Sequence, residues 1–395
     1  MLYMKRIIIV NNNMKVGGVQ KSLYNLLWTI DTEREYDVTL LLFSKTGAYV
    51  DKLPTGVKVI ESAGPFRYLG VSQGEVKGRV KNAVCRGFLA TMSRVFGREL
   101  TLRFMSIFES KLKDEYDCAI SFLHNGRRKA FYGGAQDYVL RHINAKKKIA
   151  FLHGDYLSCG ADHKENNRMM RKFDVIAACS DGCRASIESA LPELRDKCTT
   201  VRNCHRFDEI KSEAEDNPLV YDDSVVNTVI VARLSHEKGI DRAIDAVANA
   251  NEKNIKVKLH VVGGGPMLEE LKGRANDLGI ANDVIFYGEQ SNPFRYMKNA
   301  DLLLISSYHE AAPMVIDEAL SLGIPILTTE TTSSEEMVTD EGCGWVCENT
   351  QKALNEVFIK IASDKQKLCD MKNDLLHKKM NNVIAIAQFY NLIAN

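Results

Sequence analysis

The chain has 395 residues, of which 45% are hydrophobic and 26% charged, and its formal net charge is +1. This composition is that of an ordinary globular protein and excludes a disordered chain. The length favours two domains over a single core. A net charge close to zero argues against a protein that binds nucleic acid through its overall charge.

The ten cysteines form no recognisable framework. Cys179 and Cys183 are four residues apart, as are Cys343 and Cys347, but neither pair has a partner at zinc-finger spacing. The apolar run near the N-terminus, IIIV, is too short for a secretory signal, and no segment approaches the length of a membrane span. We therefore expect reduced thiols and a cytoplasmic protein that is soluble or peripheral to the membrane.

The first half of the chain alternates apolar, β-rich runs with helical stretches. These runs lack strict alternation, so they predict strands that are buried on both faces of a parallel sheet. A helix is expected at about 20–29. The predicted strands are KRIIIV from Lys5, DVTLLLF from Asp37, VKVIE from Val57, DCAISFL from Asp117, KKIAFLHG from Lys147 and DVIAACS from Asp174.

The stretch at 208–224 (DEIKSEAEDNPLVYDDS) is acidic and polar, and we predict it to be a linker. A second series of strands follows it, again with helices between them. These strands are NTVIVARL from Asn227, KLHVVGGG from Lys258, DVIFYG from Asp283, ADLLLISS from Ala300, IPILTT from Ile324 and GWVC from Gly344. Strand–helix alternation implies βαβ units, so the predicted fold class is α/β with two parallel-sheet domains in tandem.

One region departs from this pattern. Residues 67–148 contain 17 lysines and arginines against seven acidic residues. Within it, residues 76–114 (VKGRVKNAVCRGFLATMSRVFGRELTLRFMSIFESKLKD) interleave basic residues with Val, Phe, Leu and Met at helical spacing. Such a segment either lies on an anionic bilayer or is a solvated helix packed on its own sheet, and the sequence leaves both possibilities open.

Two cations follow the first strand of the second series. VARLSHEKGID places Arg233 at the end of the strand and Lys238 at the start of the next helix. Ligands of open α/β sheets bind at the carboxyl ends of the strands, and cations at a helix N-terminus can hold an anion. Taken alone, such a pair is more often two solvated cations at a turn. The next strand ends in VVGGGP, with Gly264, which lacks the dinucleotide-binding spacing and is explained by a tight turn.

Two carboxylates frame a helix in ADLLLISSYHEAAPMVIDEALSLG, which begins at Ala300. Pro313 suits the first turn of a helix, so Glu310 precedes the helix and Glu318 lies in its second turn. Buried charge is costly unless it is paired or hydrogen-bonded. The two carboxylates would therefore flank a ligand lying across the helix N-terminus, where unpaired N–H groups can hold a phosphate.

Together these segments resemble glycosyltransferase family 4, a retaining family of the GT-B fold, in its bacterial polysaccharide-biosynthesis type. The resemblance covers nearly the whole chain and depends on the order and spacing of the motifs. They are KVGGVQKSLYNLL, FLHGDY, VIAACSDGCRASI, RLSHEKG, VGGGP, ADLLLISSYHE, Glu310-x7-Glu318 and EALSLGIPILTT. One departure is Ala311, where the family commonly has glycine.

The resemblance implies two Rossmann-like domains facing a central cleft. The acceptor-side domain would comprise residues 1–207 and the nucleotide-sugar-binding domain residues 225–378. A C-terminal helix at about 379–395 would pack back on the first domain.

The resemblance also implies roles for individual residues. Arg233 and Lys238 would clamp the diphosphate, Glu318 would bind the ribose, and Glu310 would hold the donor sugar. Gly17 and Gly18 would admit the diphosphate to the backbone, and His153 would orient the sugar. The implied catalytic residues are His153, Glu310, Arg233 and Lys238. The implied donor site comprises Gly17, Gly18, Arg233, Lys238, Gly264, Glu310, Ala311, Ala312, Pro313, Met314, Val315 and Glu318.

The implied activity is transfer of a sugar from a nucleotide sugar, with a UDP-sugar as the expected donor, to a glycan acceptor. No metal and no cofactor are expected, nor is nucleic acid. The acceptor is expected to be lipid-linked, in cell-surface polysaccharide biosynthesis at the inner face of the membrane. The alternatives are a nucleotide-sugar 2-epimerase and a non-catalytic sugar-nucleotide-binding partner subunit. For His124, His205 and His309 a structural role is expected.

Overall fold

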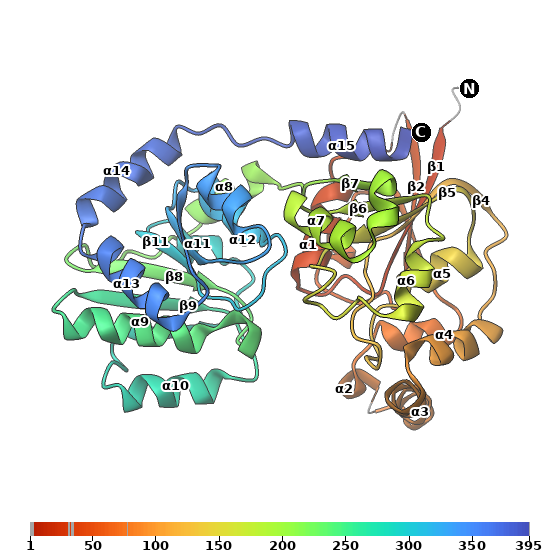
Figure 1. Ribbon diagram of the computed structural model, residues 1–395, viewed down its shortest axis with the longest axis horizontal. Helices are drawn as coiled ribbons and strands as arrows, with labels where there is room; N and C mark the ends of the chain where they lie inside the picture. The colour runs from red at the N-terminus through yellow and green to blue at the C-terminus, as the bar shows by residue number, and fades with distance from the viewer. Residues whose placement is uncertain (1–3, 31, 33–34, 77, 395) are drawn as a thin grey trace. The chain divides into compact units, whose positions relative to one another are not determined.

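The computed structural model describes residues 4–30, 32, 35–76 and 78–394, and the chain divides into two compact units (Figure 1). Residues 1–204 and 382–395 form the first unit, and residues 205–381 form the second. Each unit contains one sheet, and every strand pair in both sheets is parallel. Among the helices described, none is both long and apolar enough to cross a membrane.

The first sheet has seven strands in the order β3-β2-β1-β4-β5-β6-β7. Residues 7–10 of the interior strand β1 are fully buried, as expected for a sheet covered on both faces. Six of the seven strands were predicted, and the three-residue β7 was missed because it is too short to form an apolar run. The strands are β1 (Lys5–Asn11), β2 (Tyr36–Leu42), β3 (Val57–Glu61), β4 (Glu115–Ser121), β5 (Asn144–Leu152), β6 (Val175–Ala178) and β7 (Cys198–Thr200).

The helices of the first unit include the last helix of the chain, α15. Its Tyr390 ring stacks on Tyr36 with ring centroids 5.4 Å apart, and Lys5 Nζ donates a hydrogen bond of 2.7 Å to the carbonyl of Ile393. The helices are α1 (Gly18–Leu27), α2 (Gln73–Val76), α3 (Val80–Phe96), α4 (Arg98–Ile107), α5 (Ala135–His142), α6 (Lys164–Met170), α7 (Asp181–Ala190) and α15 (Val383–Ala394).

The second sheet has six strands in the order β10-β9-β8-β11-β12-β13, and all six were predicted. The strands are β8 (Val226–Val231), β9 (Val257–Val262), β10 (Val284–Gly288), β11 (Leu302–Ile305), β12 (Ile326–Thr329) and β13 (Gly344–Cys347). The helices are α8 (Phe207–Glu215), α9 (Ile240–Glu252), α10 (Leu268–Asp277), α11 (Phe294–Met297), α12 (Met314–Ser321), α13 (Gln351–Ala362) and α14 (Lys365–Leu376).

The predicted linker at 208–224 is instead part of the second unit. Its first half lies in α8, whose Ile210 and Ala214 are buried in the hydrophobic core of that unit. Its second half is held by Tyr221, whose hydroxyl donates a 2.6 Å hydrogen bond to the carbonyl of Tyr296. The acidic composition concealed this packing because the part of α8 within 208–224 buries only two apolar residues, one helical turn apart.

Candidate functional site

The residues singled out in the second half of the sequence gather at one edge of the second sheet. Because all six strands run in the same direction, the segments that follow β8, β9, β11 and β12 lie at the same, carboxyl edge. Arg233 and Lys238 follow β8, Gly264 follows β9, and Glu310 follows β11. This is the edge at which open α/β sheets bind ligands.

The centre of this edge is an ion pair between Lys238 and Glu310. Lys238 Nζ lies 2.6 Å from Glu310 Oε1, and the same oxygen accepts a 2.7 Å hydrogen bond from the hydroxyl of Ser307. The side chains are 24% and 12% exposed, respectively, so the pair is partly shielded from water but reachable from outside. In such a pair the ammonium group can still donate a hydrogen bond to an anionic ligand group, and the carboxylate can still accept one from a ligand hydroxyl.

The backbone around Lys238 is fixed to the segment that follows β11. The amide of Tyr308 donates to the carbonyl of Glu237, and the Ser306 hydroxyl donates to the carbonyl of Lys238. Gly239, at the start of α9, has a φ of 58°, and a Cβ there would lie 2.2 Å from the carbonyl oxygen of Ser306. Only glycine permits this close approach, so Gly239 is required for the position of Lys238.

The N-terminus of α12 lies directly after Glu310. Pro313 is the N-cap residue, with an extended backbone and no side-chain hydrogen bond to the helix. Met314 and Val315 are the first two helical residues, and their amides belong to the first turn, where no intrahelical partner exists. Glu318, in the second turn, is only 4% exposed. The edge thus combines a helix N-terminus with two carboxylates, as the sequence predicted.

The alanines that replace the family's usual glycine adopt ordinary backbone conformations. Ala311 and Ala312 form a bend, and neither is among the described non-glycine residues with positive φ, which are Asn217 and Asn254. The turn before α12 therefore needs no glycine, which answers the question raised by Ala311.

Arg233 differs from Lys238 in its surroundings. Its guanidinium pairs with Glu237 at 2.6 Å, and its side chain is 69% exposed. A surface ion pair of this kind contributes little to stability. Arg233 therefore lies at the candidate edge with an exposed side chain that an arriving anion can reach.

The same edge contains four residues that the sequence analysis missed. Arg242, in α9, is buried and donates a 2.6 Å hydrogen bond to Asn349 Oδ1. Its guanidinium carbon lies 4.7 Å from the centroid of the Tyr308 ring. Asn349 Nδ2 in turn donates to the carbonyls of Tyr308 and Glu330. Tyr308 also stacks on His236. The sequence could have indicated Arg242, because it lies one helical turn after Lys238. It could not have indicated Asn349, because the residues that Asn349 contacts are distant in the chain.

The glycines and histidine predicted for the first unit also follow its strands. Gly17 is the N-cap of α1 and Gly18 its first residue. A Cβ at Gly18 would meet nothing within 4 Å, so the packing of this unit does not require glycine there. Open space in front of the backbone is what close approach by a ligand would need.

His153 follows β5 and is packed between aromatic rings. Its ring lies 4.5 Å from that of Phe151 and 4.3 Å from that of Phe122, measured between centroids. Burial lowers the pKa of His153 to about 3 and that of the neighbouring His124 to about 4. Both imidazoles are therefore neutral at pH 7 and can orient a hydroxyl group but carry no charge.

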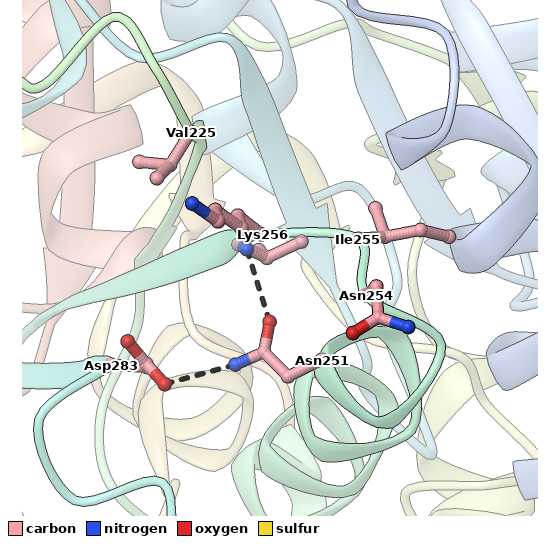
Figure 2. Close-up of a pocket in the computed structure, with 7 residues that line it drawn as sticks. Val225, Asn251, Asn254, Ile255, Lys256 and Asp283 are labelled. Atoms are coloured by element: carbon pink, nitrogen blue, oxygen red, sulfur yellow. Dashed lines mark hydrogen bonds between the residues drawn. The ribbon is translucent and has the colours of Figure 1, made fainter.

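A pocket lies elsewhere on the second unit (Figure 2). Its lining includes Val225, Asn251, Lys256 and Asp283, and Asn251 Nδ2 donates a 3.0 Å hydrogen bond to Asp283 Oδ2. These residues precede β8, β9 and β10, so the pocket lies at the amino edge of the sheet, opposite to Lys238 and Glu310. Its lining is mostly apolar or internally hydrogen-bonded, and we do not assign the site to it.

No group of three or more His, Cys, Asp and Glu side chains that could hold a metal ion occurs among the residues that the structure describes. All ten cysteines lie in the described ranges, and none of them is joined in a disulfide.

Two all-parallel, Rossmann-like units place this chain in the GT-B fold class, and solved structures share its fold. Anabaena HepE in complex with UDP matches with a TM-score of 0.67 and 17% identity, over 99% of this chain and 100% of that chain. WaaG, a glycosyltransferase involved in lipopolysaccharide biosynthesis, matches with a TM-score of 0.64 and 17% identity, over 98% and 100%. Residues 212–375 match the family model of glycosyl transferases group 1. The matched residues lie within the second unit, which contains the Lys238–Glu310 pair.

Curated relatives match over part of the chain. An uncharacterised glycosyltransferase of Methanocaldococcus jannaschii is 29% identical over 163 residues, 40% of each protein. The lipopolysaccharide glucosyltransferase WaaG of Escherichia coli is 35% identical over 125 residues, 31% of this chain and 33% of WaaG. The lipopolysaccharide 1,6-galactosyltransferase of Salmonella typhimurium is 31% identical over 174 residues, 43% of this chain and 46% of that protein. The chain thus spans less than half of the length of these relatives.

Proposed function

We propose that this protein is a retaining glycosyltransferase that moves a sugar from a nucleotide-sugar donor, a UDP-sugar, to a glycan acceptor in cell-surface polysaccharide biosynthesis. The observation that carries the proposal is the Lys238–Glu310 ion pair, which lies beside the N-terminus of α12 at the ligand-binding edge of a group 1 glycosyltransferase domain. The acceptor is a lipid-linked glycan, and the protein acts in the cytoplasm at the inner face of the membrane.

The donor would use each group at this edge differently. Lys238 and Arg233 would neutralise the diphosphate, and the amides of the first turn of α12 would add partial positive charge. Glu318 would accept hydrogen bonds from the ribose, which accounts for a carboxylate that is buried in α12. Solved structures of the same fold, such as Anabaena HepE, contain UDP or UDP-glucose, and this supports a UDP-sugar as the donor.

Catalysis would depend on stabilising the leaving diphosphate. Lys238 is pre-positioned by its bond to Glu310, so little reorganisation is needed when negative charge develops on the leaving group. Glu310 would meanwhile hold hydroxyls of the donor sugar. In the first unit, Gly17 and Gly18 would let the diphosphate approach the backbone closely. Neutral His153 would orient the sugar. No metal ion takes part in the proposed reaction.

The relatives support the acceptor class. The E. coli and Salmonella relatives act on lipopolysaccharide, and another E. coli relative, 32% identical over 136 residues, is an O-antigen biosynthesis glycosyltransferase. All three names describe the building of cell-surface glycans, so we infer the same class of acceptor for this chain.

The decisive experiment is a panel of UDP-, GDP- and ADP-sugars tested by thermal shift and calorimetry. A ligand that binds only the folded state raises the melting temperature, and the rise grows with the ratio of ligand concentration to dissociation constant. A shift selective for a UDP-sugar would support the donor assignment, whereas a shift only with GDP- or ADP-sugars, or with no member, would contradict it. With the selected donor, NMR of the products separates the activities. A new glycoside with retained configuration supports the proposal, whereas a 2-epimer formed without acceptor identifies an epimerase.

A further inference from the structure

The helices α3 and α4 expose far more apolar surface than the rest of the described chain. Of the 18 large hydrophobic side chains that are exposed among the described residues, nine fall within residues 80–108. Scattered exposed apolar residues need no explanation, but a contiguous group marks an interaction site. The nine are Val80, Val84, Phe88, Val95, Phe96, Leu100, Phe104, Ile107 and Phe108.

In α3 these side chains form a stripe on the side away from the core. Leu89 is buried and faces the interior of the first unit. Val80, Val84, Phe88 and Val95 lie within roughly 80° of one another when successive residues turn by about 100°. This arc is centred on the side opposite Leu89. The helix therefore has two apolar faces, and only one is covered by its own unit.

The shorter helix α4 repeats this arrangement. Its buried face contains Leu102 and Met105, whereas Leu100, Phe104 and Ile107 are exposed at spacings of four and three residues. The rings of Phe88 and Phe104 make an edge-to-face contact with centroids 6.3 Å apart. This contact joins the two stripes into one surface, which we call the α3–α4 face and define by the nine exposed residues given above.

The charges around the α3–α4 face are almost all positive. The two helices contain five basic residues and one acidic residue, Glu99, which is already paired with Arg103 and Arg168. In α3, the exposed Lys81 and Arg94 flank the apolar stripe on its two sides, at about +100° and −40° from Val80. An apolar stripe with cations on both sides is the pattern of a helix that lies in the interface of an anionic bilayer.

The α3–α4 face adjoins the carboxyl edge of the first sheet. Asn12, after β1, donates to the carbonyl of Leu69, and Lys15 pairs with Glu75 in α2. Arg98, at the start of α4, donates to the carbonyl of Gly126, after β4. In the first unit, α2, α3 and α4 lie at the end opposite the start of β1 (Figure 1). The face is thus built on the loops that form the ligand-binding edge of this unit.

We propose that the α3–α4 face docks the first unit onto an anionic phospholipid bilayer. Its aromatic and aliphatic side chains enter the boundary between headgroups and acyl chains, and Lys81 and Arg94 face the acidic headgroups. The charge pattern selects this partner because the cations flank the stripe and have almost no acidic neighbours. Docking holds the carboxyl edge of the first sheet close to the membrane. If the proposed function is correct, this is where a lipid-linked acceptor presents its glycan.

The test is co-flotation of the full chain with vesicles of phosphatidylcholine alone or with 30 mol% phosphatidylglycerol, without nucleotide, so that its outcome does not depend on donor binding. We expect binding only to the anionic vesicles, weakened by salt. Val84→Ser/Phe88→Ser/Ile107→Ser should lower the partition coefficient at least tenfold. Lys81→Gln/Arg94→Gln should lower it by roughly thirty-fold, or about fivefold for each charge. The matched controls, Val220→Ser/Leu278→Ser and Lys253→Gln/Lys360→Gln, remove exposed residues of the second unit and should bind as the parent does.

Three outcomes would overturn the proposal. They are no flotation with anionic vesicles at low salt, equal flotation with neutral vesicles, and unchanged flotation of both α3–α4 variants. Light scattering of the parent in solution gives a further test. A dimer that the apolar variant converts to a monomer would show that a second copy of the chain covers this face. Circular dichroism and the melting temperature check that each variant is folded, as exposed substitutions should be.

Discussion

Lys238 Nζ lies 2.6 Å from Glu310 Oε1, although 72 residues separate the two in the chain. The pairing exists because the segments after β8 and β11 lie side by side and are joined by the hydrogen bond from the Tyr308 amide to the carbonyl of Glu237. It places a shielded cation and a carboxylate next to the N-terminus of α12. The predictions below test this edge and the packing that supports it.

The two cations at this edge should account for most of the affinity for a nucleotide sugar. Arg233→Ala/Lys238→Ala is expected to weaken donor binding at least 100-fold, because charge-assisted hydrogen bonds to a diphosphate are each worth about 1.5–3 kcal/mol. Isothermal titration calorimetry provides the measurement. Lys253→Ala/Lys360→Ala removes two exposed cations of the same unit and serves as the control. An unchanged dissociation constant in the first variant would refute the site assignment.

Glu318 should be a ligand-binding residue and not a structural one. Glu318→Gln preserves the shape of the side chain and removes its charge, so we expect a dissociation constant at least tenfold higher with a melting temperature within a few degrees of the parent. Glu356→Gln, at a 67% exposed side chain, is the matched control. Normal affinity together with a large fall in melting temperature would instead assign Glu318 to the core of the unit.

Gly239 should be needed for stability as well as for the position of Lys238. In Gly239→Ala the new methyl group would lie 2.2 Å from the Ser306 carbonyl in a left-handed conformation, so we expect a loss of at least about 2 kcal/mol. Gly273→Ala is the control because that glycine lies within α10 with open space around it, and it should stabilise by about 0.5–1 kcal/mol. Urea unfolding measures both. Equal stability of the two variants would show that the loop relaxes without cost.

His142 should make the first unit sensitive to acid. Burial lowers the pKa of His142 from 6.5 to about 4, and nearby Arg141 and Lys111 act in the same direction. The ring lies between Phe66 and Tyr138. Because the unfolded chain binds the proton more readily, the folded state loses stability as the pH falls from about 6.5 to about 4. The loss is roughly 3 kcal/mol.

His142→Phe keeps the aromatic contacts and removes the titrating group. The variant should therefore lose less stability than the parent over this pH range, as measured by urea unfolding at pH 7.5, 6 and 4.5. His377→Gln changes an exposed histidine of the second unit and serves as the control. Parallel pH profiles for His142→Phe and the parent would show that folding does not lower the pKa of His142.

The sequence by itself determined the α/β class, most of the strands and the start of the helix between Glu310 and Glu318. Strands buried on both faces are continuous apolar runs, and helix-start signals such as Pro313 are local, so both can be recognised without a structure. The spacing from Glu310 to Glu318 correctly placed one carboxylate before α12 and the other inside it. The same local reasoning mistook α8 for a linker, because its two buried residues stand among acidic ones.

The tertiary structure decided which of these residues meet. Neither the Lys238–Glu310 bond nor the contact of Arg242 with Asn349, 107 residues away, can be derived from spacing, because both depend on strand order. The structure also decided which side of the basic segment is covered. Leu89 and Val84 are equally apolar in sequence, yet one is buried and the other is 64% exposed. Helical periodicity defines both faces of α3, but only the packing of the first unit determines which one remains open to a partner.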